Sequence, residues 1–250
     1  MPTFERDGAT IAYEAYGTGF PILLFAPGGL RSRMEMWPAP AGGPPRSWND
    51  WTNVLSDTYC VIAMDQRNAG KSRGPIAADH GWHTYAADHI GLMDYLGIKK
   101  FHTLGGCIGA SFCLKLCEVV PDRVASAVLQ NPIGFNPEHP AYFPDSFAEW
   151  SKEQHAARPD LDAAAVQAFG RNMWGGDFAY SVSRDFVRRC KTPCLVLPGD
   201  DVPHPAVTGA ELAQILPNVE QLKDWKGPEH LDAQRRTVVD FLARHTPPAT

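Results

Sequence analysis

Short apolar runs that end in glycine-rich or polar loops alternate along the chain with stretches of helical periodicity. The run at 21–26 is apolar throughout and is followed by Pro27-Gly28-Gly29, and the runs at 59–64 and 124–130 have the same character. Continuous apolar runs of this length are typical of strands that are buried on both faces of a sheet. The pattern therefore predicts parallel strands in the middle of the fold.

The remaining elements follow from the same two periodicities. Further strands are predicted at 9–16, 101–104, 194–198 and 219–222, and helices at 86–96, 110–119, 210–216 and 231–244. The alternation stops over 135–190, where helical stretches near 145–157 and 161–173 carry many aromatic residues. This order predicts an α/β fold with a mostly parallel central sheet and helices on both faces. Its core comprises 1–134 and 191–250, and 135–190 is an inserted helical cap.

Composition narrows the choice of partners. Of the 250 residues, 44% are hydrophobic and 20% are charged, which is enough apolar surface for a large core. The net charge of −5 argues against nucleic acid or an anionic membrane as a partner. The first residues lack the apolar segment of a secretory signal, and no apolar run is long enough to span a bilayer. We expect a cytoplasmic protein that acts on a small molecule, with its oligomeric state left open.

Six cysteines include two pairs with C-x3-C spacing, Cys113/Cys117 and Cys190/Cys194. Such pairs can bind zinc, but no histidine stands at ligand spacing beside them. Buried free cysteines behave as small hydrophobic residues. Core packing is therefore the preferred interpretation, and neither a metal nor a cofactor is expected.

The segment Gly105-Gly106-Cys107-Ile108-Gly109 fits the G-x-S-x-G pattern of a nucleophile elbow, with a thiol in place of the usual hydroxyl. By itself this pattern also fits a buried cysteine among glycines. A predicted strand precedes it and a predicted helix follows it, which is the context that an elbow requires. The N-terminus of that helix favours a thiolate at Cys107. Cys107 is therefore the candidate nucleophile.

A nucleophile of this kind needs a base, and the base needs a carboxylate that orients it. Asp201 follows the strand at 194–198, and His230 lies between the last strand and the last helix, so the order nucleophile, acid, histidine is kept. Asp200 is a second candidate acid. His204 is a second candidate base, but it lies only three residues after Asp201, and His230 is preferred.

With these motifs the chain resembles the α/β-hydrolase fold superfamily over nearly its whole length. Asp65-x-Arg67-x-x-Gly70-x-Ser72 resembles the superfamily segment D-x-R-G-x-G-x-S, with Asn68 at the first glycine. The acid loop resembles G-x-x-D-x-x-x-P, shortened by one residue before the acid. The main departure from the superfamily pattern is the cysteine at the nucleophile position. In this respect alone the chain resembles dienelactone hydrolases. An engineered replacement of serine is the alternative origin of this cysteine.

The resemblance also implies an oxyanion hole and an acyl pocket. The loop Ala26-Pro27-Gly28-Gly29 corresponds to the oxyanion loop of the superfamily, with Ala26 in place of its histidine. The implied donors are the backbone N–H groups of Gly28 or Gly29 and of Ile108. Candidate substrate contacts, for which packing is the competing role, are Met36, Trp37, Trp150 and Trp174.

These features predict a hydrolase for a small activated acyl substrate, namely a lactone, ester or thioester, that works through a Cys-His-Asp triad and a thioester intermediate. The same site could serve an acyltransferase or a carbon–carbon bond hydrolase. A hydrolase-like protein that binds a small ligand with vestigial turnover is the alternative from another class. Turnover of an ester probe with release of product separates the two classes.

Overall fold

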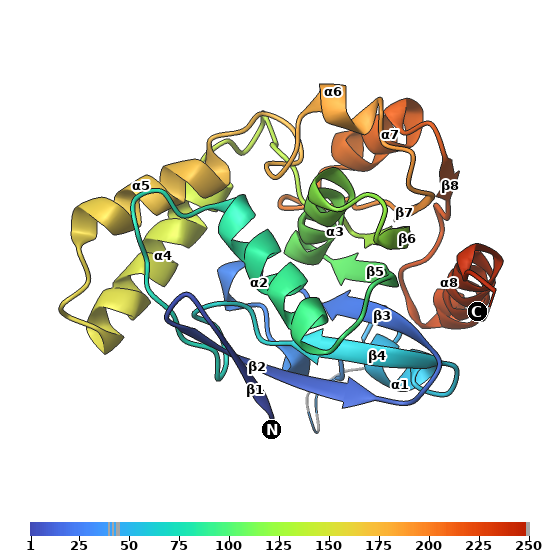
Figure 1. The fold of residues 1–250 in the computed structure, drawn as a ribbon. Coiled ribbons are helices and arrows are strands. Elements are labelled where there is room, and N and C mark those ends of the chain that lie inside the picture. The colour runs from blue at the N-terminus through green and yellow to red at the C-terminus, as the bar shows by residue number, and fades with distance from the viewer. Residues whose placement is uncertain (40, 42, 44–45, 249–250) are drawn as a thin grey trace.

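The fold is an eight-stranded sheet with helices on both sides (Figure 1). It comes from a computed structural model, which describes residues 1–39, 41, 43 and 46–248. The strand order is β1-β2-β4-β3-β5-β6-β7-β8. All the pairings from β4 to β8 are parallel, whereas β1 and β2 join one edge in antiparallel pairings. The predicted α/β class with a mostly parallel sheet is confirmed.

The element bounds are as follows. The strands are β1 Thr3–Arg6, β2 Ala9–Tyr16, β3 Phe20–Phe25, β4 Tyr59–Met64, β5 Phe101–Gly106, β6 Val124–Gln130, β7 Cys194–Leu197 and β8 Val219–Gln221. The α-helices are α1 Trp51–Leu55, α2 Trp82–Tyr95, α3 Ile108–Val119, α4 Tyr142–Ala157, α5 Ala163–Trp174, α6 Arg184–Val187, α7 Ala206–Ile215 and α8 Leu231–His245. Single 3₁₀ turns are η1 Gly29–Arg31, η2 Met34–Met36 and η3 Pro228–His230.

The continuous apolar runs have a simple cause, because each central strand has a hydrophobic cluster on both faces. In β3, Leu23 and Phe25 join the cluster that α2, α3 and the segment after β6 cover. Ile22 and Leu24 join the cluster on the other face, under α1 and α8. Alternate side chains point to opposite faces of a strand, so both sets must be apolar.

Sequence and structure agree best for the long elements. The strands β2, β4 and β6 have the predicted bounds, whereas α2 begins at Trp82, earlier than the predicted start at 86. The hydroxyl of Thr84 accepts the N–H of Gly81 at 3.1 Å and stabilises that earlier start. The short elements β1, α1 and α6 were not predicted, because four or five residues carry too little periodicity.

The predicted insertion contains three helices. α4, α5 and α6 lie between β6 and β7, and α4 and α5 project to one side of the sheet (Figure 1). The aromatic residues of the insertion belong to the same hydrophobic cluster as those of α2 and α3, and within it the Trp150 ring lies 5.7 Å from the rings of both Phe147 and Phe169. Aromatic pairs at this distance add to the hydrophobic stabilisation of α4 against α5.

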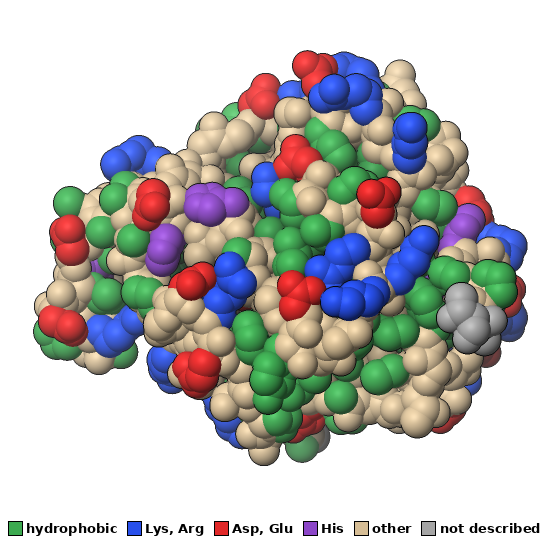
Figure 2. Space-filling model, in the orientation of Figure 1, with side chains coloured by type: hydrophobic (Ala, Val, Ile, Leu, Met, Phe, Trp, Pro, Cys, Tyr) green, Lys and Arg blue, Asp and Glu red, His purple; other side chains and the backbone are tan. Residues whose placement is uncertain are grey.

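Acidic and basic side chains are interspersed on the face of the molecule that Figure 2 shows. None of the described helices is both long enough and apolar enough to cross a membrane.

Two buried histidines make the fold sensitive to acid. His89 and His102 are fully buried, and burial lowers the pKa of each to about 3. Because the unfolded chain binds protons at these histidines below about pH 6.5 and the folded chain does not, stability falls as the pH falls from about 6.5 towards 3. We expect a loss of about 1.4 kcal/mol per pH unit for each histidine in urea unfolding. His102→Gln should reduce this slope, whereas His139→Gln at the exposed surface should not; equal slopes in all three proteins would contradict the prediction.

Candidate active site

The turn between β5 and α3 has the strained geometry of a nucleophile elbow. Cys107 has φ 59° and ψ −122°, a backbone conformation that non-glycine residues rarely adopt. A Cβ on Gly105 would overlap the carbonyl group of Gly109, and a Cβ on Gly109 would overlap the carbonyl of Phe25. Only glycine fits at both positions, so the predicted need for small neighbours has a direct steric cause.

Three groups surround the sulfur of Cys107. The backbone N–H groups of Gly28 and Ile108 and the side chain of His204 all lie close enough to the sulfur to lower its pKa. Burial alone would raise the pKa of the thiol, but the hydrogen bond and charge of His204, followed by the two amides, lower the pKa of Cys107 below its usual value. The sulfur therefore lies in an environment that stabilises its thiolate.

His204 is bound to Asp201 on its opposite side. Its Nδ1 lies 2.5 Å from Oδ1 of Asp201, and its ring is 12% exposed. Burial opposes protonation of the ring, but interactions with Cys107 and then with Asp201 raise the pKa of His204 above its usual value. Together the two shifts favour a thiolate–imidazolium pair between Cys107 and His204.

In the structure the histidine beside Cys107 is thus His204, whereas the sequence favoured His230. His230 lies in the turn η3, and its Nε2 is 3.6 Å from Oε1 of the neighbouring Glu229. Although only three residues separate them in sequence, the carboxylate of Asp201 can reach the imidazole of His204, because the two residues form a tight turn. The N–H of His204 donates to the backbone oxygen of Asp201 and to its Oδ1, both at 3.1 Å. The D-x-x-H spacing after β7 was the available signal in the sequence.

The structure separates the two candidate acids. Asp201 is bound to His204, whereas Asp200 pairs with Lys226 from the segment after β8. The same ammonium group lies 3.7 Å from Oδ2 of Asp201. This geometry agrees with the choice of Asp201 over Asp200.

The oxyanion loop presents one of the two glycines named from the sequence. The N–H of Gly28 reaches Cys107, and this residue has φ 127°. A Cβ at this position would overlap the sulfur of Met36, so Met36 packs directly against the oxyanion loop. Gly29 begins η1 and has open space where a Cβ would be.

The other proposed substrate contacts fall into two groups. Trp37 and Trp150 are almost completely buried, at 0% and 1% exposure, and pack in the two hydrophobic clusters on opposite faces of the sheet. Trp174 is partly exposed, stacks on Phe143 at 4.6 Å, and lines a pocket of about 390 Å³ between α4 and α5. Of the three tryptophans, Trp174 is the one that a ligand could contact.

Tyr142, at the start of α4, was not identified from the sequence. Burial, followed by the negative charges of Cys107 and Asp201, raises its pKa. The phenol therefore lies close enough to the sulfur to sense its charge, and α4 brings the insertion to the site. Nothing in the local sequence around Tyr142 marks this proximity.

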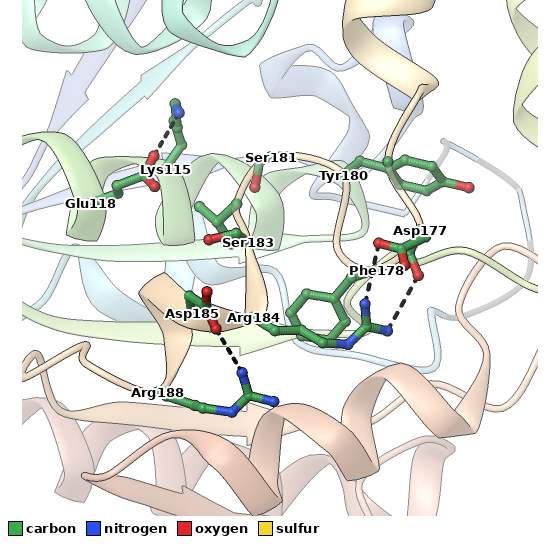
Figure 3. Close-up of a pocket in the computed structure, with 12 residues that line it drawn as sticks. Lys115, Glu118, Asp177, Phe178, Tyr180, Ser181, Ser183, Arg184, Asp185 and Arg188 are labelled. Atoms are coloured by element: carbon green, nitrogen blue, oxygen red, sulfur yellow. Dashed lines mark hydrogen bonds and ion pairs between the residues drawn. The ribbon is translucent and has the colours of Figure 1, made fainter.

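A polar pocket of about 600 Å³ lies apart from this constellation, over α3 and α6 (Figure 3). Its cations are already paired: Lys115 with Glu118, Arg184 with Asp177 and Glu211, and Arg188 with Asp185. A charged ligand would have to break these pairs, so the pocket is assigned no role. No group of three candidate metal ligands occurs among the residues that the structure describes.

Comparison with known proteins agrees with this fold. The profile of the α/β hydrolase fold family matches residues 21–187. The chain belongs to the α/β-hydrolase fold family. A protein named "Putative carbamate hydrolase RutD" from Pseudomonas savastanoi pv. phaseolicola is 27% identical over 239 residues, which cover 82% of this chain and 92% of that protein. The family, its fold and its hydrolase class agree with the expectation from the sequence.

Two solved structures share the α/β-hydrolase fold with this chain. The enol-lactonase from Burkholderia xenovorans LB400 has 22% identity and a TM-score of 0.68, and the match covers 97% of this chain and 100% of that one. A meta-cleavage product hydrolase from Pseudomonas fluorescens IP01 has 18% identity and a TM-score of 0.70, with 98% of each chain covered. At these identities the likeness establishes the fold.

Exchange of each candidate acid for its amide tests the assignment of Asp201. We expect Asp201→Asn to lower kcat by roughly 10⁴-fold, the effect of the same change in a serine protease triad, because the ring of His204 loses its orienting carboxylate. Asp200→Asn is the matched control and should retain most activity, since its carboxylate binds Lys226 instead. Steady-state kinetics on one ester substrate compares them, and a larger loss at Asp200 would reverse the assignment.

Proposed function

We propose that this hydrolase-fold protein cleaves small activated acyl compounds through a cysteine nucleophile. Cys107 attacks, His204 transfers protons and Asp201 orients the imidazole. The observation that carries this proposal is the convergence of His204 and the N–H groups of Gly28 and Ile108 on one sulfur atom. A buried structural thiol would not require a base and two amide donors.

In the first half of the reaction, the thiolate of Cys107 forms a bond to the carbonyl carbon, and the carbonyl oxygen becomes an oxyanion. The negative charge has then moved from the sulfur to that oxygen. The N–H groups of Gly28 and Ile108 therefore hydrogen bond to the oxygen and no longer to the sulfur. As the tetrahedral intermediate collapses, the bond to the leaving oxygen breaks, and His204 donates its proton to that oxygen. A thioester on Cys107 remains.

In the second half, His204 is neutral and accepts a proton from water. The resulting hydroxide attacks the thioester carbonyl, and the same two amides hold the oxyanion. The carbon–sulfur bond then breaks, which releases the acid product and restores the thiolate beside protonated His204. Because Asp201 holds Nδ1 in a fixed orientation, Nε2 faces the sulfur in both halves.

The substrate class follows from the thiolate. A thiolate leaves a tetrahedral intermediate more readily than an alkoxide does, so the substrate needs a good leaving group of its own. Lactones, enol esters and thioesters meet this requirement, and the relatives named for an enol lactone and a carbamate are of the same broad acyl type.

The insertion at 135–190 is proposed to act as a cap that selects small substrates. Its helix α4 brings Tyr142 towards Cys107, and Arg31 after the oxyanion loop binds Glu153 of α4 through two hydrogen bonds of 2.8 Å. These contacts tie the insertion to the segment after the oxyanion loop.

Trapping of the acyl intermediate tests the proposal. Rapid quenching of a reaction with a p-nitrophenyl ester, followed by peptide mass spectrometry, should find the acyl group on Cys107, and free acid should then appear. Trp174→Ala should alter the size preference across a panel of esters, lactones and thioesters, whereas the buried Trp150→Ala should mainly lower stability. Turnover without an adduct on Cys107, or labelling of another residue, would overturn the mechanism.

A further inference from the structure

Three of the four cysteines in the two C-x3-C pairs, which the sequence suggested as packing residues, lie together in space. Cys117 near the end of α3, Cys190 after α6 and Cys194 at the start of β7 have side chains that lie close enough to shift one another's pKa. All three are buried. They belong to a part of the fold that the proposed reaction does not use, since that reaction takes place at the opposite end of α3.

Of the three thiols, Cys190 is the one whose surroundings most favour the thiolate form. The neighbouring thiols of Cys117 and Cys194, followed by the backbone and side chain of Thr192, lower the pKa of Cys190 against the opposing effect of burial. The thiolate is the form of cysteine that reacts with oxidants. Cys190 is therefore the expected site of first oxidation in this cluster.

A cavity gives small molecules access to two of the three thiols. Its volume is about 420 Å³, and its lining includes Cys117 and Cys190 but not Cys194. The thiol of Cys194 donates to the backbone oxygen of Thr192 at 3.4 Å and is fully buried. Cys117, which shares the cavity wall with Cys190, is thus the better placed resolving thiol.

We propose that Cys190 and Cys117 are a redox-sensitive pair that forms a disulfide on exposure to hydrogen peroxide. The thiolate of Cys190 attacks one peroxide oxygen, the oxygen–oxygen bond breaks, and the departing hydroxide takes up a proton, which leaves a sulfenic acid. Cys117 then attacks the sulfur of that sulfenic acid, and its proton leaves with the hydroxyl as a second water. Two thiols are oxidised and one peroxide is reduced.

The disulfide would join α3 to the chain as it returns from the insertion to β7, so that α4, α5 and α6 all lie within the closed loop. Closing a long loop reduces the conformational freedom of the unfolded chain. The oxidised protein is therefore expected to have a higher Tm, and a thiol reductant should reverse the change. Because the side chains are 1% and 2% exposed, hydrogen peroxide should react faster than the bulky glutathione disulfide.

The experiment uses the full chain with Cys107→Ser, because the thiolate of Cys107 would itself react with peroxide. Non-reducing peptide mapping after treatment should show a Cys117–Cys190 cross-link, a mass lower by two hydrogen atoms and a raised Tm. Addition of Cys60→Ser, a half-buried cysteine of β4, should leave the cross-link unchanged, whereas addition of Cys190→Ser should abolish it. A Cys190–Cys194 cross-link, sulfinic or sulfonic acid at Cys190 without a disulfide, or unreacted thiols would each overturn the proposal, and none of these results bears on Cys107.

Discussion

His204→Ala is expected to lower kcat on an ester substrate by on the order of 10⁶-fold, the scale seen when the histidine of a catalytic triad is removed. Two effects combine in this loss. The variant has no group to protonate the leaving oxygen, and Cys107 loses the neighbour that contributes most to its low pKa. The measurement is steady-state kinetics at several pH values, in which part of the lost rate should return at high pH as the thiol ionises.

His230→Ala is the control for this experiment. The two histidines were the competing candidates in the sequence, and only His204 contacts both Cys107 and Asp201 in the structure. We expect His230→Ala to retain activity near that of the wild type. A greater loss at His230 than at His204 would mean that the acid loop rearranges before catalysis.

Cys107→Ala is expected to abolish turnover, with residual activity roughly 10⁶-fold below the wild type if the nucleophile behaves as it does in other triads. Cys107→Ser should keep a small fraction, because the elbow suits a serine but a hydroxyl is not ionised beside His204 near neutral pH. Circular dichroism and thermal unfolding should show that both variants remain folded.

Alkylation by iodoacetamide reports the thiolate directly. In the wild type, the half-maximal rate at Cys107 should occur below the usual thiol pKa of about 8.5, and His204→Ala should shift it upward. Labelling that persists in Cys107→Ser measures the other cysteines and is subtracted. A pH profile that His204→Ala leaves unchanged would contradict a thiolate–imidazolium pair.

The elbow and its surroundings could be predicted because their signals are local. Spacing alone indicated Cys107 with small residues around it, and the helix after it indicated the N–H of Ile108 as a donor. Asn68 also fits, since it stands where the family has glycine and adopts φ 62°, a conformation that asparagine tolerates better than most residues.

The partner of Cys107 could not be settled in this way, because the choice of histidine depends on tertiary contacts. β7 lies two strands from β5 in the sheet and runs parallel to it, so the loop after β7 and the elbow after β5 lie at the same edge of the sheet. The meeting of Cys117 with Cys190 likewise depends on where α3 ends relative to the start of β7. Spacing along the chain carries no information on either distance.

The placement of Asp201 and His204 in one turn has a consequence for motion at the site. Their backbones exchange hydrogen bonds of 3.1 and 3.3 Å, so thermal displacement of the loop carries the imidazole and its carboxylate together. The contact that such a displacement breaks is the one to Cys107, which belongs to a different element. Displacement of the loop therefore removes the imidazolium that stabilises the thiolate of Cys107. The hydrogen bond between Asp201 and His204 is kept, so the pair can bind Cys107 again when the loop returns.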